Sequence, residues 1–382
     1  MPKSRLSLIG RRGFVIGGAA GFASAASAEA LRPKPRPRRG QTDPSAELTQ
    51  LLGARIMVGF VGQDPIDDGV QIVADQIAKG EIGGVILLQR NLSSPDQVAG
   101  LTAFLRQARP DLPPLIAVDN EGGKVQRAGP RNGFAPWVSA AQLGQDCADA
   151  ACAQTYYAAG ARQLRQAGIT LNFGPVVDLA ANPDNPVIAG LDRAFDADPD
   201  RVAAMASGFV QAHRAARVAT CLKHFPGHGS TGKDSHHELP DISADWSDQE
   251  LLPYRTLIAA DQVDMVMMGH LVHPRFSEAG LPASLSVRGV TALRDLGFFG
   301  PVTSDDLQME AIAAHHDEPT ATRLAAQAGL DMLLFNTFKK PEPQIGPRIL
   351  GHLRQLAQDK MLDPSQIKAS HDRLATLRKS LI

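Results

Sequence analysis

Side chains that could do chemistry concentrate in one short stretch, Leu222–Pro240, which reads LKHFPGHGSTGKDSHHELP. Its lysine, histidine and carboxylate side chains and its three glycines make it too polar and too glycine-rich for a core helix or a central strand. We therefore expect a structured loop that carries chemistry. Asp234 and His236 are separated by one residue, so in an extended loop their side chains point the same way. A carboxylate beside an imidazole fixes its tautomer and raises its basicity, and such a pair can donate and recover a proton.

Further polar side chains follow apolar runs, at the points where strands are expected to end. They are Asp119, the pair Lys223 and His224, His270, and the pair Asp305 and Asp306. A carboxylate on a separate strand, such as Asp305, suits a nucleophile. A nucleophile together with an acid/base group is what retaining cleavage of a glycosidic bond requires, although both groups are usually carboxyls. Arg127, Arg193 and Lys223 are donors suited to hydroxyl and carbonyl oxygens.

A metal site is the competing interpretation of the same stretch. The candidate ligands are His224, His228, Asp234, His236 and His237. His224 and His228 have the i, i+4 spacing of ligands on a helix, but Pro226 and the neighbouring glycines disfavour a helix there. The HExxH motif is also absent. A metal-dependent hydrolase is therefore the weaker alternative.

The elements that must position these residues repeat one pattern from about Asp43 onward, a short apolar run and then an amphipathic helical run. Eight runs are expected to be strands: Arg55–Val61, Gly84–Leu88, Leu115–Asp119, Thr170–Val177, Val218–Leu222, Met265–Met268, Gly300–Ser304 and Met332–Phe335. Apolar strands that alternate with helices imply a parallel sheet. Eight such units predict an α/β fold, a single closed (β/α)8 barrel of TIM type with an extra C-terminal helix, and the polar clusters then meet at one mouth. An open doubly wound sheet is the alternative, but no GxGxxG follows the first strand.

The N-terminal residues differ in composition from the rest. Residues 1–28 carry Arg11 and Arg12, continue through a weakly apolar stretch and end in a small-x-small triplet, Ala26–Ala28. This order predicts an export signal, and the paired arginines favour the twin-arginine type over the Sec type. Residues 29–44 are expected to form a linker rich in proline and arginine, and residues 45–382 the catalytic barrel. We expect an exported protein, periplasmic or extracellular.

Composition narrows the range of functions. The 382 residues carry a net charge of −1, but four positive charges and no acid lie in residues 1–28, which leaves −5 for the rest. A mildly acidic body disfavours nucleic acid as a partner, and no apolar run reaches the length of about 18 residues that spans a membrane. The three cysteines form no CxxC motif, so neither a zinc site nor a disulfide framework is predicted; a bridge between Cys147 and Cys152 stays open. We favour a monomer.

Several long motifs resemble those of glycoside hydrolase family 3, in its bacterial single-domain β-N-acetylhexosaminidase branch. KHFPGHGSTGKDSHHELP (Lys223–Pro240) is similar to the family's signature, and VDNEGGKVQR (Val118–Arg127) to its aspartate-bearing sugar loop. The segments NFGPVVDLAANPDNPVI (Asn172–Ile188), DRAF (Asp192–Phe195) and SDDLQM (Ser304–Met309) resemble others in the family's order. Matches run from about residue 48 to 337, and several long motifs in order are far more specific than one short pattern.

The resemblance implies a role for each matching residue. Asp305 corresponds to the nucleophile that forms a covalent glycosyl-enzyme, His236 to the acid/base, and Asp234 to its partner. The residues that correspond to those holding a terminal N-acetylglucosamine unit are Asp119, Arg127, Arg193, Lys223 and His224. The implied enzyme is a retaining exo-β-N-acetylglucosaminidase without cofactor, and its implied substrates are peptidoglycan fragments or chito-oligosaccharides. The departures from the family pattern bear on substrate preference and include Asn120, Lys124, Ala194 and Ser230.

Two alternatives remain on the same scaffold. A phosphorylase is one, because a histidine acid/base lacks the negative charge that repels phosphate. A non-catalytic glycan-binding protein is the other, because a fold does not dictate an activity. For the enzyme, we expect Phe225–Lys233 to form a glycine-rich mobile arm that brings Asp234 and His236 to the bond.

Overall fold

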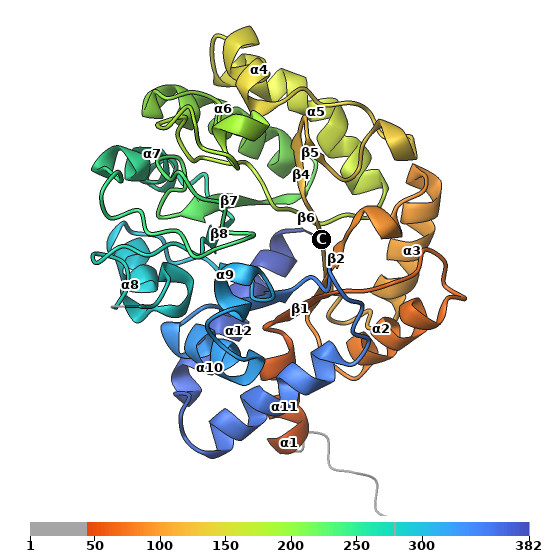
Figure 1. Ribbon diagram of the computed structural model, residues 1–382. Helices are drawn as coiled ribbons and strands as arrows, with labels where there is room; N and C mark the ends of the chain where they lie inside the picture. Colours follow the sequence, from red (N-terminus) through yellow and green to blue (C-terminus); the bar gives the residue numbers. More distant parts are fainter. Residues whose placement is uncertain (1–43, 279, 382) are drawn as a thin grey trace, which may run out of the picture. The chain divides into compact units, whose positions relative to one another are not determined.

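The structure, a computed structural model, describes residues 44–278 and 280–381. In this part of the chain eight parallel strands close into a barrel in the order β1-β10-β9-β8-β7-β6-β3-β2 (Figure 1). These strands are β1 (Ile56–Gly59), β2 (Gly84–Leu87), β3 (Leu115–Val118), β6 (Leu171–Asn172), β7 (Ala219–Phe225), β8 (Met265–Met268), β9 (Val302–Asp306) and β10 (Met332–Phe335). The predicted (β/α)8 barrel is thereby confirmed, and the doubly wound alternative is wrong.

Helices surround the barrel (Figure 1). They are α1 (Pro44–Gly53), α2 (Asp68–Ala78), α3 (Pro95–Gln107), α4 (Ala140–Asp146), α5 (Ala150–Gln166), α6 (Pro199–Ala215), α7 (Leu252–Ala259), α8 (Val287–Asp295), α9 (Glu310–Ala313), α10 (Glu318–Ala328), α11 (Ile345–Gln358) and α12 (Pro364–Ser380). Several begin where a side chain accepts a hydrogen bond from an otherwise unpaired amide of the first turn. Asp149, Asp317 and Asp363 cap α5, α10 and α12 in this way.

The strands are buried on both faces, and their residues alternate between two apolar layers. In β1, Ile56 and Val58 pack in the layer shared with the helices, whereas Met57 packs in the barrel interior. Leu374 and Leu377 of α12 join the interior layer, and Arg378 donates to the carbonyl of Gly83 just before β2, at 2.8 Å. Helix α12 therefore closes the N-terminal end of the barrel and leaves the carboxyl ends of the strands for the site.

The strands near the site differ from the predicted ranges. β6 is shorter than predicted, because Gly174 and Pro175 follow it and proline cannot donate to a ladder. β7 is longer and includes Lys223 and His224, which were expected at its end. A hairpin of β4 (Asn120–Gly122) and β5 (Val125–Gln126) was not predicted, because such short strands show no periodic pattern.

The structure does not test the predictions made for the N-terminal residues. The predicted export signal and most of the predicted linker lie outside the described residues. Among residues 44–278 and 280–381, no helix combines the length and hydropathy that crossing a bilayer would need.

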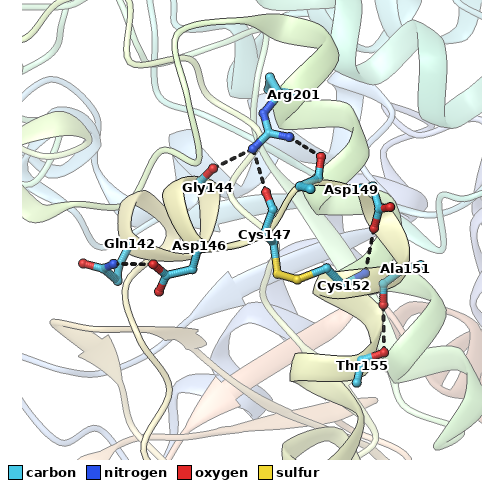
Figure 2. The surroundings of a disulfide bond; sticks show 10 residues. Gln142, Gly144, Asp146, Cys147, Asp149, Ala151, Cys152, Thr155 and Arg201 are labelled. Carbon is cyan, nitrogen blue, oxygen red and sulfur yellow. Dashed lines mark hydrogen bonds between the residues drawn. A yellow bond between two sulfur atoms is a disulfide. The ribbon is translucent and has the colours of Figure 1, made fainter.

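A disulfide joins Cys147, which follows α4, to Cys152 in the first turn of α5 (Figure 2). The turn between these helices is held further by Arg201, which donates to the carbonyl oxygens of Gly144 at 2.6 Å and Cys147 at 2.7 Å. Asp149 accepts from the Cys152 amide at 2.9 Å. The sequence left this bridge open because spacing alone does not fix how close two cysteines come.

Removing the disulfide is expected to lower the free energy of unfolding by about 2 kcal/mol, because a bridge that closes so short a loop constrains the unfolded chain only modestly. The variant is Cys147→Ser with Cys152→Ser, measured by urea unfolding against the wild type. Dithiothreitol should destabilise the wild type and leave the double variant unchanged. Equal midpoints for oxidised wild type and double variant would show that the bridge adds no stability.

Candidate active site

A cavity of about 690 Å³ opens at the carboxyl ends of the barrel strands. All eight residues that the sequence assigned to the site line it: Asp119, Arg127, Arg193, Lys223, His224, Asp234, His236 and Asp305. They come from five separate segments of the chain, so the barrel does bring together what the sequence keeps apart.

One side of the cavity is a buried network of charges. The ammonium of Lys223 lies 2.9 Å from Asp119 and 2.7 Å from Glu121, and Arg193 donates two hydrogen bonds to Glu121, at 2.7 and 2.8 Å. Burial alone would raise the pKa of Glu121, but Arg193 and Lys223 outweigh it and hold that pKa well below its usual range. Glu121 thus fixes both cations and leaves Asp119 as the more exposed carboxylate.

Glu121 was not predicted, although it lies within the sugar-loop segment. Nothing in its sequence position separates a carboxylate that neutralises two buried cations from one that contacts a ligand. The structure assigns it to the first role, because the Glu121 side chain is only 4% exposed and pairs with both cations. Arg127 also lines the cavity, and no carboxylate of the described residues lies within ion-pair distance of it. Arg127 is therefore free to contact a ligand.

His224 is held by Asp178, another residue that the sequence analysis did not single out. Asp178 accepts from the His224 ring Nδ1 at 2.7 Å and from the backbone amides of His224 and His228 at 3.0 and 2.8 Å. The bond to Nδ1 directs Nε2 toward the cavity, where it lies 3.4 Å from Arg193. Asp178 is fully buried, so its role is to orient His224 rather than to bind substrate.

Asp305 lies in β9 and is partly buried in the cavity wall. Burial would raise its pKa, but the nearby His270, His224 and His236 and the Asp306 amide lower that pKa to about 2. Its neighbour Asp306 behaves in the opposite way, because burial raises its pKa to about 7. The ionised Asp305 can attack an electrophile, whereas Asp306 accepts from the amides of Asn336 and Gln308 at 3.1 and 3.2 Å and so fixes the backbone.

Asp234 and His236 form the predicted dyad, on the loop that follows β7. His236 Nδ1 lies 2.8 Å from Asp234 Oδ1, and the His236 amide donates to the same oxygen at 2.9 Å. Although partial burial opposes it, the His236 amide and ring lower the pKa of Asp234, so that carboxyl is ionised at neutral pH. The imidazole is 57% exposed and its charge acts on Asp305. The dyad therefore offers its free Nε2 for proton transfer.

The base of the loop that leads to this dyad is buried. Residues Phe225–Thr231 are all buried, and exposed residues begin at Gly232. Asn185 donates to the carbonyls of His228 and Gly229 at 2.8 and 3.2 Å, and Asn182 to that of Thr231 at 3.2 Å. The predicted mobile arm over Phe225–Lys233 is therefore wrong for its first part. Glycines there permit close packing, not only motion: a Cβ on Gly229 would lie 1.9 Å from a backbone oxygen.

Glu250 is a third residue missed from the sequence, where it reads as an ordinary acid at a helix start. Its oxygen Oε2 accepts from the Leu179 amide at 3.3 Å, whereas Oε1 is buried without a hydrogen-bond partner among the described residues. Burial and then the charge of Asp178 raise its pKa to about 8, so the carboxyl is mostly neutral at pH 7. A neutral acid therefore supports the base of the loop.

Replacing Glu250 by glutamine should change how stability depends on pH. Because the folded protein holds the Glu250 proton more tightly than the unfolded chain, wild-type stability falls as pH rises from the ordinary glutamate value toward about 8. Glu250→Gln has no proton to lose at this position, so it escapes this loss of stability. The melting temperature of the variant minus that of the wild type should therefore increase between pH 5 and pH 8. Glu250→Leu, which leaves the Leu179 amide unpaired, should be less stable than both at every pH. A constant difference between Glu250→Gln and wild type across this range would contradict the buried neutral acid.

The metal interpretation gains no support from the described residues. Among residues 44–278 and 280–381, no group of three or more histidine, cysteine, aspartate or glutamate side chains is arranged to hold a metal ion. His224 and His236, two of the candidate ligands, each bind a carboxylate through Nδ1 instead.

Known proteins are similar to this chain in sequence and in fold. The sequence profile of the Glycosyl hydrolase family 3 N terminal domain matches residues 48–377. A Beta-hexosaminidase from Alkalilimnicola ehrlichii is 39% identical over 282 residues, 71% of this chain and 77% of that protein. A Beta-hexosaminidase A from Pseudoalteromonas piscicida is 32% identical over 87% of this chain, which spans only 61% of that longer protein.

Solved structures lead to the same family. A glycoside hydrolase family 3 β-N-acetylglucosaminidase from Paenibacillus sp. str. FPU-7 superposes with a TM-score of 0.80 at 33% identity, over 87% of this chain and 62% of that one. A β-N-acetylhexosaminidase from Beutenbergia cavernae gives a TM-score of 0.77 at 27% identity, over 87% of this chain and 98% of that one. The chain belongs to glycosyl hydrolase family 3 and is a glycoside hydrolase of the β-hexosaminidase type.

Proposed function

We propose that this chain is a retaining exo-β-N-acetylglucosaminidase that acts through a covalent glycosyl-enzyme on Asp305. The observation that carries the proposal is the pairing of an ionised Asp305 with an acid/base dyad on a different segment of the same cavity. Retaining cleavage of a glycosidic bond needs an ionised nucleophile and a separate proton donor. The names of the relatives support the choice of sugar.

The first step breaks the glycosidic bond. Asp305 attacks the anomeric carbon of the terminal sugar, while protonated His236 gives its Nε2 proton to the leaving oxygen. The ionised Asp234 on Nδ1 stabilises the imidazolium before transfer and fixes the tautomer afterwards. The products of this step are the released alcohol and a sugar ester on Asp305.

The second step releases the sugar. The now neutral His236 takes a proton from water, and the resulting hydroxide attacks the anomeric carbon from the face that the alcohol left. The Asp305 carboxylate departs, so two inversions give net retention of configuration. Atoms balance, since one water is consumed and the His236 proton is restored.

The buried charge network supplies donors and acceptors for the bound sugar. Arg193 and Lys223 are fixed by Glu121 before any ligand binds, so little side-chain entropy is lost when they bind hydroxyl or carbonyl oxygens. Asp119 is the acceptor for hydroxyl groups, and His224 and Arg127 lie in the same cavity. We assign these five residues to the terminal N-acetylglucosamine unit.

The function is tested by release of 4-nitrophenol from its β-N-acetylglucosaminide, with the β-glucoside and the α-N-acetylglucosaminide as comparisons. Turnover of the first compound and not of the other two supports the proposal. Failure to turn over any of the three, with binding of N-acetylglucosamine intact, would favour the non-catalytic glycan-binding protein.

A phosphorylase remains the second candidate, and the half-exposed His236 favours it. Because its proton donor becomes neutral in the glycosyl-enzyme, phosphate can approach without charge repulsion. Formation of N-acetylglucosamine 1-phosphate in phosphate buffer, at a rate above that of hydrolysis, would establish it. Free N-acetylglucosamine as the sole product would establish the hydrolase.

We also propose that the protein is exported and works in the periplasm or outside the cell. The paired arginines of the N-terminal segment support this, as does the Cys147–Cys152 disulfide, since such bonds persist in oxidising compartments. Fusion of residues 1–44 to a reporter that is active only after export tests it, with Arg11→Lys and Arg12→Lys together as the variant that should retain the reporter inside.

A further inference from the structure

Helix α4 connects the Cys147–Cys152 disulfide to the part of the cavity that we assign to the terminal sugar. Cys147 directly follows the last residue of the helix, and the bridge ties it to Cys152 in α5 (Figure 2). The helix has only seven residues, and a helix of that length is not stable by itself in water. Its position therefore depends on the contacts that hold its two ends.

The N-terminal end of α4 packs against the sugar loop. Ser139 caps the helix and lies so close to Gly123 that a Cβ on that glycine would be 2.7 Å from the Ser139 side chain. The Gly123 amide also donates to the carbonyl of Trp137 at 3.0 Å. Gly123 lies two residues after Glu121 in the chain. A shift of this end of α4 would therefore disturb the carboxylate that fixes both buried cations.

The middle of α4 contacts the segment that carries Arg193. The Ala141 amide donates to the carbonyl of Asp192 at 3.2 Å. Gly144 packs on the backbone of Phe195, since a Cβ on Gly144 would lie 1.9 Å from the Phe195 carbonyl oxygen. Asp192 and Phe195 lie on either side of Arg193 in the chain. Helix α4 thus supports the short segment from which the Arg193 guanidinium reaches the cavity.

The C-terminal end of α4 is held by Arg201 of α6 and by the disulfide. Arg201 donates to the carbonyls of Gly144 and Cys147, and neither bond involves a sulfur atom (Figure 2). A groove of about 550 Å³ lies at the bridge and is lined by both cysteines, and Cys152 is exposed. Thiols in solution reduce exposed disulfides most readily. A dithiol can therefore reach this bridge while the protein stays folded.

We propose that the Cys147–Cys152 disulfide is a redox-sensitive positioning device for the sugar site. The oxidised bridge holds α4 against the segments that carry Glu121 and Arg193, and its reduction weakens binding of the terminal sugar. In that reaction a dithiol gives up two electrons and two protons and becomes a disulfide, while the S–S bond of the protein breaks and two thiols form. The inference rests on the proposed function and names a regulation of the same site.

Reduction should affect binding rather than the chemical steps. The nucleophile lies on β9 and the acid/base dyad on the loop that follows β7, so neither is carried by a segment that α4 supports. An enzyme with this device binds its substrate tightly only in an oxidising compartment, where such bonds persist. Its activity on dilute substrate is therefore low wherever the bridge is reduced.

The test compares the oxidised enzyme with the enzyme reduced by dithiothreitol, using 4-nitrophenyl β-N-acetylglucosaminide well below the melting temperature. Reduction should raise KM, and the inhibition constant of added N-acetylglucosamine, about fivefold or more, as for a modest coupling between two sites. kcat should stay within about twofold, because losing binding that substrate and transition state share raises KM alone. Reoxidation should restore both constants. Dithiothreitol acts on this bridge only, since the remaining cysteine, Cys221, is buried and free.

Two variants separate positioning from stability. Cys147→Ser with Cys152→Ser should have the constants of the reduced enzyme and should not respond to dithiothreitol. Asp363→Ala is the matched control, because it removes the side chain that caps α12 at the other end of the barrel. It should lower the melting temperature and leave KM and the inhibition constant as in the oxidised wild type.

Three results would overturn the inference. They are unchanged KM and inhibition constants in the reduced enzyme and the double variant, a fall in kcat with KM unchanged, and an Asp363→Ala variant whose KM rises as much as theirs. Failure of the proposed function is a different result, because in that case neither the oxidised nor the reduced enzyme would release 4-nitrophenol.

Discussion

Asp305→Ala is expected to lower kcat/KM for 4-nitrophenyl β-N-acetylglucosaminide by at least about four orders of magnitude, or ~5 kcal/mol of transition-state stabilisation. Asp305 is the group that the cavity keeps ionised, since three histidines and an amide hold its pKa near 2 despite burial. Without it, no carboxylate of the described residues in this cavity is both ionised and unpaired. Steady-state release of 4-nitrophenol measures the loss.

The adjacent carboxyl provides the matched control for that variant. Asp306→Asn keeps an acceptor oxygen for the Asn336 and Gln308 amides, so it should cost far less than Asp305→Ala. Azide should restore turnover to Asp305→Ala by occupying the space of the lost carboxylate, and the product should be the α-glycosyl azide, since only one inversion then occurs. If Asp306→Asn is as damaging as Asp305→Ala and azide restores neither, the assignment of the nucleophile fails.

His236→Gln is expected to have an effect that depends on the leaving group. A disaccharide has a poor leaving oxygen that needs a proton, so its kcat/KM should fall about 10²- to 10⁴-fold, the usual contribution of general acid catalysis. A dinitrophenyl glycoside leaves without help, so its kcat/KM should fall much less. The ratio of the two losses is the measurement, and a merely structural role for His236 would reduce both equally.

Two neighbours of His236 serve as comparisons. His237 is 83% exposed and lies 3.8 Å from Asp234, so His237→Gln should show neither the loss nor its dependence on the leaving group. Asp234→Asn should show the same dependence as His236→Gln with smaller amplitude, because it removes the charge that stabilises the imidazolium. A large loss for His237→Gln would move the acid/base role to that residue.

The parts of this structure that the sequence predicts are those with a repeating physical cause. Buried parallel strands need apolar residues on both faces, which is why the predicted runs Gly84–Leu88 and Met332–Phe335 match β2 and β10 within one residue. The position of Asp305 at the cavity follows from the same geometry, because β9 ends there, whereas the pairing of His236 with Asp234 is predictable from their spacing in the loop after β7.

The parts that it does not predict depend on contacts between distant segments. Asp178 is recognisable as a partner of His224 only once β6 and β7 are adjacent. Glu250 has an unusual pKa only because the loop base covers it. The first part of the segment expected to be a mobile arm, Phe225–Thr231, is buried. Glycines permit both backbone motion and close packing, and composition alone does not tell which of the two a glycine-rich segment uses.

The central claim, a covalent sugar ester on Asp305, is tested most directly by trapping it. His236→Gln should accumulate the intermediate with a dinitrophenyl β-N-acetylglucosaminide, because that leaving group departs unaided while the attacking water lacks its base. After rapid acid quench and proteolysis, mass spectrometry should locate N-acetylglucosamine on the peptide that contains Asp305, and Asp305→Ala with His236→Gln should carry no label. An unlabelled Asp305 peptide together with a free sugar oxazoline would mean that the substrate's own acetamido group attacks the anomeric carbon, and would contradict the claim.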